Sequence, residues 1–521
     1  MGEYIGLTAM GIVCALGNDA TTVWKRAQVG DVSGMKVLSG VLPAEQTTLF
    51  GSCDVKDQTF PSRVAQLIAA AVKDMTLEVE KLKEVYGANR IGVVVGTSNS
   101  TMEEYTKAQD KIDMATPAIF LREYLNLSGP ALSVSTACSS SVKVFATARK
   151  LINSGVCDAV VAGGADSFSR VVVNGFDALE VVNRNLTTPM GEGREGINLG
   201  EGAAFFTLEK NRGAIALLGI GESSDAYHLT APHPEGNGAE ASMRLALADA
   251  SLDSKDIVYL NLHGTGTIQN DRMESMAVWR VFGDGPLCSS SKPMIGHGLG
   301  AAGALETALC YLMLVNGNKA LPHPLAGNVD AELPKLRLAK VDDVFHPGPV
   351  LSNSFAFGGS NASIIIGPAR PCDILPHDPP MVLLSAIDPS SLTEESLTAF
   401  VEITKDSPFF DESLCGVPSV FALEYMAQTM AALVGLKRRN MRLEPRIGFV
   451  LGTRSIKTYI EKFENARRYR VDVKLDFTDG SFASFDVKIT DSLDNVVAEG
   501  RLNAFEPESE DVQNFKEGAN V

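Results

Sequence analysis

One cysteine and two histidines stand where a parallel α/β sheet usually carries its active site. Cys138 lies between an apolar strand pattern and a helix pattern at 142–152, and the positive end of a helix dipole stabilises a thiolate nucleophile. His263 follows the apolar run 258–262, and His297 lies in a glycine-rich turn before another helix pattern. Taken singly, each residue type is more often structural. Together they indicate nucleophilic catalysis by a thiol assisted by two imidazoles.

Neither a metal nor a nucleotide cofactor is expected at these residues. The histidines lack HxxxH and HExxH spacing, and the chain contains no CxxC pair. The run 296–303 reads GHGLGAAG rather than GxGxxG, and it lacks the strand–helix–strand context of a dinucleotide site. The sequence therefore predicts a site that works with side chains and backbone alone.

The elements around these residues alternate between strand and helix over residues 1–367. Short apolar runs at 91–95, 159–162 and 258–262 predict buried strands, and the patterns at 63–75 and 301–315 predict helices. This alternation favours parallel sheets covered by helices. A weak internal repeat of the same order of elements indicates two related halves.

The chain has a clear boundary after residue 367. Five prolines in 368–380 predict an inter-domain linker, and the acidic stretch 506–521 predicts a loose tail. In between, the region 381–505 has one apolar helix pattern at 420–436 followed by alternating strand patterns. One helix and an antiparallel meander suggest a sheet wrapped around a central helix.

Composition excludes several classes of function. The 521 residues carry a net charge of −17, which disfavours nucleic acid as the main partner. No uninterrupted apolar stretch reaches the ~18 residues of a membrane span, and the N-terminus lacks the basic region of a targeting signal. Eight scattered cysteines suit the reducing cytoplasm, where we expect the protein to act.

Residues 1–367 resemble the β-ketoacyl-acyl carrier protein synthases, the elongating condensing enzymes of fatty acid, polyketide and aryl polyene synthesis. The resemblance implies a thiolase fold of two similar halves, packed as a five-layer α/β/α/β/α sandwich, and a dimer that is either homomeric or formed with a synthase-like subunit. It also implies acyl carrier protein as partner. Four motifs carry it: TACSS at 136–140, HGTGT at 263–267 with Asn270-Asp271, the segment from Lys292 through His297 to Glu306, and NSFAFGGSN at 353–361.

The same resemblance implies a role for each matching residue. Cys138 is expected to carry the acyl chain, and His263 with His297 to stabilise the enolate formed from malonyl-carrier protein. Lys292 and Glu306 are expected to hold the histidines within a buried charge network. Phe357, Gly358 and Gly359 are expected to form the oxyanion hole and gate, and the two histidines distinguish the elongating synthases from thiolases.

Residues 381–505 resemble the hotdog-fold dehydratases of aryl polyene synthesis. The matching stretches are LPH at 375–377, ALEYMAQ at 422–428 and RIGFVLGT at 446–453. Glu424 matches the acid on the central helix, but Phe410 stands where active dehydratases carry a histidine, 14 residues earlier. His377 lies in the predicted linker, at a position that is more often structural in this family. We therefore expect a module that is inactive or that depends on a separate hotdog partner.

Two alternatives remain open at this level. The chain is either a bifunctional ketosynthase–dehydratase, which needs an acid/base pair that is not evident within 381–505, or a non-catalytic scaffold subunit. Cys138, His263 and His297 argue against a scaffold for the first domain.

Overall fold

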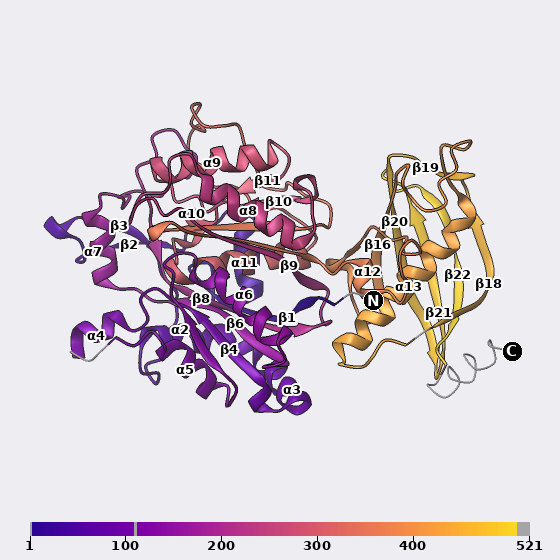
Figure 1. Cartoon of the computed structure of the whole chain (residues 1–521), viewed down its shortest axis with the longest axis horizontal. Coiled ribbons are helices and arrows are strands. Elements are labelled where there is room, and N and C mark those ends of the chain that lie inside the picture. The colour runs from indigo at the N-terminus through magenta and orange to yellow at the C-terminus, as the bar shows by residue number, and fades with distance from the viewer. Residues whose placement is uncertain (1–2, 109–111, 447, 508–521) are drawn as a thin grey trace. The chain divides into compact units, whose positions relative to one another are not determined.

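A computed structural model describes residues 3–108, 112–446 and 448–507 (Figure 1). The chain divides into two compact units. The larger consists of Leu7–Lys210 and Leu217–Gly367. The smaller is formed mainly by the chain from Pro368 onward, together with the N-terminal residues up to Gly6 and the insertion Asn211–Ala216.

The larger unit contains the same strand pattern twice. In the first half, β4 pairs in parallel with β5 and β6, and β6 pairs antiparallel with β8. In the second half, β10 pairs in parallel with β11 and β13, and β13 pairs antiparallel with β14. The duplication predicted from the sequence is therefore confirmed. The strands are β4 (Ile91–Gly96), β5 (Ala131–Val134), β6 (Ala159–Asp166), β8 (Gly202–Lys210) and β1 (Ile5–Val13), matched by β10 (Tyr259–Asn261), β11 (Leu287–Ser289), β13 (Val350–Ala356), β14 (Ser360–Pro368) and β9 (Ile215–Ser224), with β12 (Arg337–Leu338) beside β11.

Helices form the other layers of the larger unit. Helices α6 (Ser140–Asn153) and α11 (Ala302–Val315) pack on each other, α6 on strands of the first half and α11 on strands of both halves, so they form the central layer. The outer layers contain α2 and α5 on one side and α8 and α9 on the other, which gives the five-layer thiolase fold. The remaining bounds are α1 (Ala20–Ala27), α2 (Arg63–Val72), α3 (Thr76–Tyr86), α4 (Met102–Ala108), α5 (Thr116–Tyr124), α7 (Arg170–Ala178), α8 (Asn237–Ala250), α9 (Ile268–Phe282) and α10 (Lys292–Ile295), with a small sheet of β2 (Met35–Leu38), β3 (Thr48–Gly51) and β7 (Leu199–Gly200).

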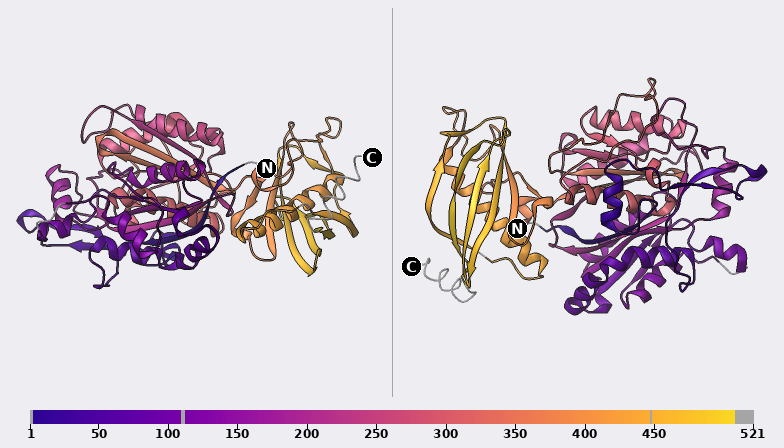
Figure 2. Two further views of the ribbon diagram at one scale, coloured as in Figure 1. Left: turned by 60° about the horizontal axis from the view of Figure 1, so that its bottom comes forward. Right: turned by 180° about the vertical axis from the view of Figure 1, so that it is seen from behind.

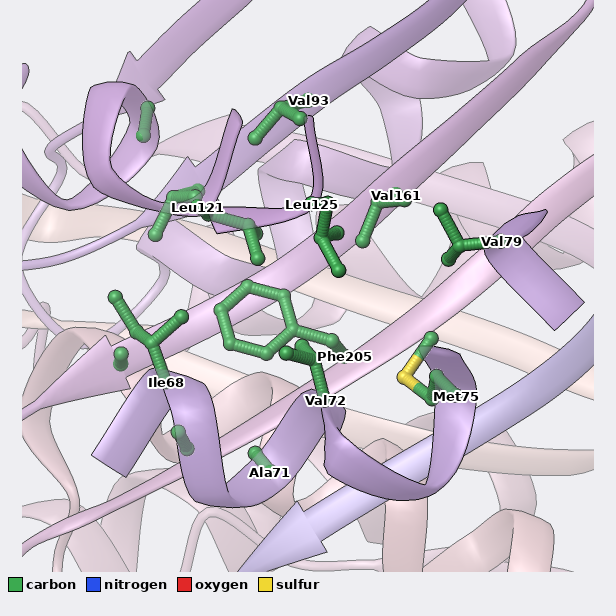
Figure 3. Packing of buried hydrophobic residues seen from close by; sticks show 14 of the residues in the cluster. Ile68, Ala71, Val72, Met75, Val79, Val93, Leu121, Leu125, Val161 and Phe205 are labelled. Atoms are coloured by element: carbon green, nitrogen blue, oxygen red, sulfur yellow. The ribbon is translucent and has the colours of Figure 1, made fainter. Parts of the chain in front are cut away.

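Apolar side chains fix these layers around the strands that carry the site loops. Figure 3 shows one cluster, in which Phe205 of β8 lies among side chains of α2, α5 and β6. Phe205, Val93 and Val161 are fully buried, and burial of each such side chain stabilises the fold by roughly 1.5–3 kcal/mol. The strands are thereby held rigid, and so are the loops that leave their carboxyl ends.

The smaller unit is an antiparallel sheet that packs on one long helix, α13 (Ala422–Asn440). The sheet order is β15-β16-β20-β21-β22-β18, and Val471, Val473 and Ile489 on its inner face are buried. Figures 1 and 2 show α13 lying across one face of this curved sheet, as the sequence predicts for a hotdog fold. The strands are β15 (Ala386–Asp388), β16 (Ser396–Ile403), β18 (Phe449–Thr458), β20 (Arg467–Asp479), β21 (Phe482–Thr490) and β22 (Val496–Phe505), with a separate pair of β17 (Gly416–Pro418) and β19 (Lys462–Glu464).

The central helix is also long and apolar enough to cross a membrane, by length and composition alone. Within the described residues, Ser419–Asn440 is the helix that passes this test, and 56% of its most apolar window is buried in the protein. Burial against β16, β20 and β21 accounts for its apolar character.

The proline-rich segment 368–380, predicted as an inter-domain linker, belongs to the smaller unit. Pro371 begins a short helix, α12 (Pro371–Ile374), and the side chains of Ile374 and Leu375 are buried. The carbonyl of Asp373 accepts a hydrogen bond of 2.9 Å from Arg439 on α13. Proline suits the first turn of a helix, and the apolar residues after it pack within the smaller unit. Most of the predicted acidic tail, 508–521, lies outside the described residues.

Candidate active site

Cys138 sits on a sharp turn between β5 and α6. Ala137 before it has φ 51°, a conformation that is strained for a residue with a side chain. The Ser140 hydroxyl holds this turn, because it accepts from the Thr136 N–H at 2.8 Å and donates to the Ala137 carbonyl at 2.6 Å. The turn places the thiol at the start of α6, where it is 6% exposed.

The structure brings both predicted histidines to this thiol. Nε2 of His297 lies 2.9 Å from Sγ of Cys138, and the His263 and His297 rings meet edge to face with centroids 5.5 Å apart. One side-chain atom from each of the three residues lies within 4.8 Å of the others. All three line a cavity of ≈ 490 Å³, which is large enough for a small-molecule substrate.

Glu274 on α9 positions His263. Its buried carboxylate accepts hydrogen bonds of 2.7 Å from the backbone N–H groups of His263 and Gly264. Burial raises the pKa of Glu274 to about 7. Sequence reasoning missed this residue, although it follows Asn270-Asp271 by one helical turn and so lies on the same face of a predicted helix.

Asp166 positions the turn that carries His297. Its carboxylate accepts from the Gly300 N–H at 2.7 Å and from the Ser98 N–H, and burial raises its pKa to about 6. A Cβ atom at Gly300 would lie 2.5 Å from the Ser98 nitrogen, so only glycine fits there. The glycine-rich run therefore reflects close approach of the backbone to buried groups rather than a nucleotide cradle.

Burial keeps both imidazoles neutral. Desolvation lowers the pKa of His263 and of His297 well below the usual 6.5, and the positive charge of Lys292 lowers both further. Nδ1 of each ring is buried and has no hydrogen-bond partner among the described residues. With the ring proton on Nε2, a neutral imidazole can donate a hydrogen bond to a carbonyl oxygen that gains charge.

Burial favours the protonated form of Cys138. Burial raises the pKa of Cys138 to about 12, although Lys292 and the backbone N–H of Phe357 act in the opposite direction. The sequence had predicted a thiolate stabilised by the helix dipole. Burial outweighs that effect, so the proton has to leave the sulfur before the sulfur can act as a nucleophile.

This protonation state predicts how Cys138 reacts with an alkylating reagent. Below its pKa, the thiolate fraction of a cysteine rises about tenfold per pH unit. We expect the rate of iodoacetamide modification of Cys138 to rise about tenfold from pH 6.5 to 7.5 and again to 8.5. Intact mass and peptide mapping would follow it, and a plateau near neutral pH would instead indicate a thiolate–imidazolium pair.

Lys292 and Glu306 form a buried ion pair beside the histidines. Nζ of Lys292 lies 2.6 Å from Oε1 of Glu306, and the side chains are 0% and 1% exposed. Burial raises the pKa of Glu306, and the charge of Lys292 opposes this. The structure thus brings the pair to the place that the family resemblance implied.

The loop that contains Phe357, Gly358 and Gly359 closes one side of the cavity. Gly358 and Gly359 have φ of 80° and 71°, and the ring of Phe357 stacks on Phe176 with centroids 5.3 Å apart. The Gly358 N–H donates to Leu229 at 2.7 Å, so a second loop supports the first. Both rings line the cavity.

A second group of titratable side chains lies in the smaller unit. Nε2 of His377 lies 3.8 Å from Oε1 of Glu424, and both side chains line a cavity of ≈ 790 Å³. Phe410, the residue at the expected histidine position, is not among the residues that line it. Within 381–505 the sequence offered no histidine, and the structure brings His377, from outside that range, next to Glu424. Spacing along the chain hid the pair, because His377 comes from the segment predicted as linker.

Cys138, His263 and His297 are also close enough to share a metal ion. Thiolate and imidazole are ligands that zinc prefers, so their geometry alone does not exclude such a site. The sequence spacing disfavours it.

Fold and site together define a condensing enzyme of the thiolase fold. Three family models match consecutive parts of the chain: "Beta-ketoacyl synthase, N-terminal domain" over residues 48–214, "Beta-ketoacyl synthase, C-terminal domain" over 215–323 and "ApeP dehydratase" over 369–517. The chain belongs to the β-ketoacyl synthase family and carries in addition an ApeP-like dehydratase domain. It is therefore an acyltransferase-type ketosynthase, related to enzymes of fatty acid, polyketide and aryl polyene synthesis.

Individual relatives agree with this assignment. Nodulation protein E of Rhizobium meliloti is 32% identical over 404 residues, which cover 70% of this chain and 98% of the relative. The 3-oxoacyl-[acyl-carrier-protein] synthase 2 of Staphylococcus aureus strain COL is 30% identical over 415 residues, with the same coverage. Among solved structures, one similar chain is the ketosynthase ApeO in complex with its chain length factor ApeC from Xenorhabdus doucetiae. It is 38% identical, with a TM-score of 0.67, and the match covers 70% of this chain and 98% of that chain.

Proposed function

We propose that Cys138, His263 and His297 perform a decarboxylative Claisen condensation of an acyl thioester with malonyl-acyl carrier protein. The observation that carries the proposal is the 2.9 Å contact between Nε2 of His297 and Sγ of Cys138 in a buried cavity that His263 also lines. Cys138 accepts the acyl group as a thioester, and the thiol proton passes to the thiolate of the carrier protein that leaves.

The two histidines then act on the malonyl group. Each neutral imidazole donates a hydrogen bond to the thioester carbonyl of malonyl-carrier protein. As carbon dioxide leaves, negative charge develops on that oxygen, and fixed donors in a water-poor site stabilise it. The resulting enolate attacks the acyl group on Cys138 and releases the sulfur.

Negative charge also develops on the carbonyl oxygen of the acyl group on Cys138 when the enolate attacks it, and backbone N–H groups stabilise that oxygen. The N–H groups of Cys138 and Phe357 face the acyl carbonyl when it becomes tetrahedral. A hydrogen bond from the Phe357 backbone N–H lowers the pKa of the Cys138 thiol, which supports this role. Gly358 and Gly359 give the loop the freedom to open for the second substrate.

The partners follow from this reaction. Acyl carrier protein delivers both thioesters, and the synthase unit forms a dimer with a second copy or with a synthase-like subunit. The complexes of two similar ketosynthases with a chain length factor support the second form. All eight cysteines are free thiols, which fits work in the reducing cytoplasm.

Intact-mass analysis tests the function directly. The full chain is incubated with octanoyl-carrier protein, and an octanoyl adduct on Cys138 is expected, followed by a 3-oxoacyl product after malonyl-carrier protein is added. Absence of both would favour the scaffold alternative. Inhibition by EDTA that zinc reverses would favour a metal at the three side chains.

Carrier protein docking should depend on salt. Carrier proteins are acidic and this chain has a net charge of −17, so binding requires a locally basic face. Because exposed charge pairs are screened beyond about 10 Å at 0.1 M salt, we expect the affinity to fall as sodium chloride rises from 0.05 to 0.5 M. Surface plasmon resonance would measure this, and an affinity independent of salt would contradict the docking mode.

A further inference from the structure

Lys143 lies in the first turn of α6, where its ammonium group meets a hydroxyl rather than a carboxylate. The residue is half-buried, and Nζ donates a hydrogen bond of 2.7 Å to the hydroxyl of Ser360. Among the residues that the structure describes, no carboxylate forms an ion pair with it. A lysine that is partly removed from water in this way loses hydration without gaining an ion pair, so the contact with Ser360 is what its position provides.

Two hydroxyl groups continue this contact toward Cys138. The Ser360 hydroxyl lies 3.0 Å from that of Ser139, and the Ser139 hydroxyl donates to the Thr136 carbonyl at 2.8 Å. Because an ammonium group can only donate, Ser360 accepts from Lys143 and has its own proton left to donate to Ser139. The hydrogen bonds therefore run in one direction, from Lys143 to the backbone two residues before Cys138.

Ser360 directly follows the loop of Phe357, Gly358 and Gly359. It begins β14 and pairs with Ala356 of β13 in the antiparallel register. Gly358 and Gly359 both have positive φ, and a Cβ atom at Gly358 would meet nothing within 4 Å, so the tip of the loop has little packing of its own. The hydrogen bond at Ser360 therefore anchors one end of a loop that is otherwise free to move.

The two segments that this chain of hydrogen bonds joins carry the two proposed oxyanion donors. Thr136 precedes Cys138 by two residues, and Ser360 follows Phe357 by three. The Phe357 N–H forms a hydrogen bond to Cys138, so movement of either segment changes where this donor meets the acyl carbonyl. Oxyanion donors act at about 2.7–3.1 Å from the oxygen, and a displacement on the order of 1 Å can lower a rate about 10²-fold.

We propose that Lys143 is a positioning residue of the condensing site. Through Ser360 and Ser139 it holds the Phe357 loop against the turn of Cys138, so that both backbone N–H groups face the acyl carbonyl when it becomes tetrahedral. The inference rests on the proposed condensation, and it adds a residue that does not line the cavity of the site. In this role Lys143 touches neither the substrate nor the reacting atoms.

The test replaces Lys143 by Met in the full chain, which keeps most of the side-chain length and removes the donor. Transfer of the acyl group from octanoyl-carrier protein to Cys138 is followed over time by intact mass. We expect the maximal rate of transfer to fall roughly 10- to 100-fold, with little change in the carrier protein concentration that gives half of it, because the substrate still binds but meets a displaced donor. Alkylation of the same sulfur by iodoacetamide forms no oxyanion, so its rate should stay unchanged.

Further variants separate positioning from folding. Ser360→Ala removes the middle of the hydrogen-bonded chain and should lower acyl transfer as much as Lys143→Met does, and the double variant should be no slower than either, since all three break one connection. Lys143→Arg keeps a group that only donates and should restore most of the rate. Lys150→Met changes an exposed lysine on the same helix and should keep the full rate. Thermal unfolding and circular dichroism establish that each variant is folded.

Hydrogen–deuterium exchange of residues 353–361 reports on the loop without any substrate. Lys143→Met and Ser360→Ala should speed exchange in this segment, whereas exchange in α3 (Thr76–Tyr86) should match that of the native protein. A native chain that transferred no octanoyl group would refute the proposed condensation, and the exchange measurement would still decide whether Lys143 holds the loop. Failure of one proposal is thus distinguishable from failure of the other.

Four results would overturn the inference. Unchanged acyl transfer in folded Lys143→Met would show that the residue does not position the donors, and loop exchange identical to that of the native protein would show that it does not hold the loop. Equal losses of acyl transfer and alkylation would place the effect on the sulfur itself. Additive losses in the double variant would mean that Ser360 acts independently of Lys143.

Discussion

Replacement of Cys138 by Ala should abolish chain elongation. The thiol is the group that carries the acyl chain, and loss of a catalytic nucleophile lowers rates by roughly 10³–10⁶-fold. The variant should still release carbon dioxide from malonyl-carrier protein, since His263 and His297 remain in place. Product formation measured by mass spectrometry and carbon dioxide release measured with labelled malonyl groups would separate the two steps.

An exposed cysteine provides the matched control for this experiment. Cys415 lies in the smaller unit and is exposed, so Cys415→Ala removes a thiol without touching the site. It should leave elongation unchanged. Elongation that persists in Cys138→Ala would mean that another group accepts the acyl chain.

Replacement of Lys292 by Met should reduce both stability and condensation. It leaves Glu306 without a partner in a position that is 1% exposed, and breaking such a pair costs about 3–5 kcal/mol of unfolding free energy. It also removes the positive charge that lowers the pKa of His263, of His297 and of the Cys138 thiol. Urea unfolding and the condensation rate would measure the two effects.

A double variant separates the structural role of the pair from its effect on the site. Lys292→Met with Glu306→Leu removes both charges, and buried pairs replaced by apolar residues often keep their stability. We expect the free energy of unfolding to recover while condensation stays low. Recovery of both stability and condensation would mean that the pair contributes only to the stability of the fold. A Lys292→Met variant as stable and as active as the native protein would show that the pair has neither role.

Much of the larger unit could be predicted because its strands and helices give patterns within short stretches of sequence. Strands buried on both faces give continuous apolar runs, as in β4, and the duplicated order of elements repeats along the chain. His263 and His297 were identified because each follows such an element directly. Glu274 and Asp166 were not, because a buried carboxylate that accepts backbone N–H groups has no pattern of its own in the sequence.

In the smaller unit, the side chains that meet could not be predicted from local sequence patterns. The α13 helix and the sheet follow from periodicity, but the meeting of His377 with Glu424 depends on how residues 371–383 fold back onto the helix. Spacing along the chain pointed to Phe410, which is not among the residues that line the cavity with His377 and Glu424. Gln428, four residues after Glu424, was a usable signal, because an amide one helical turn from a carboxylate commonly bonds to it.

The composition of the smaller unit has a consequence for protein engineering. Its segments come from three places in the chain, including the residues up to Gly6 and the insertion Asn211–Ala216. The Gly213 N–H donates to Asn440 at the end of α13, and Tyr4 donates to the Gly213 carbonyl. A recombination boundary at residue 380 would separate His377 from Glu424, and even one after Gly367 would leave these partners behind. Exchange of the dehydratase between homologous chains should therefore transfer all three segments together.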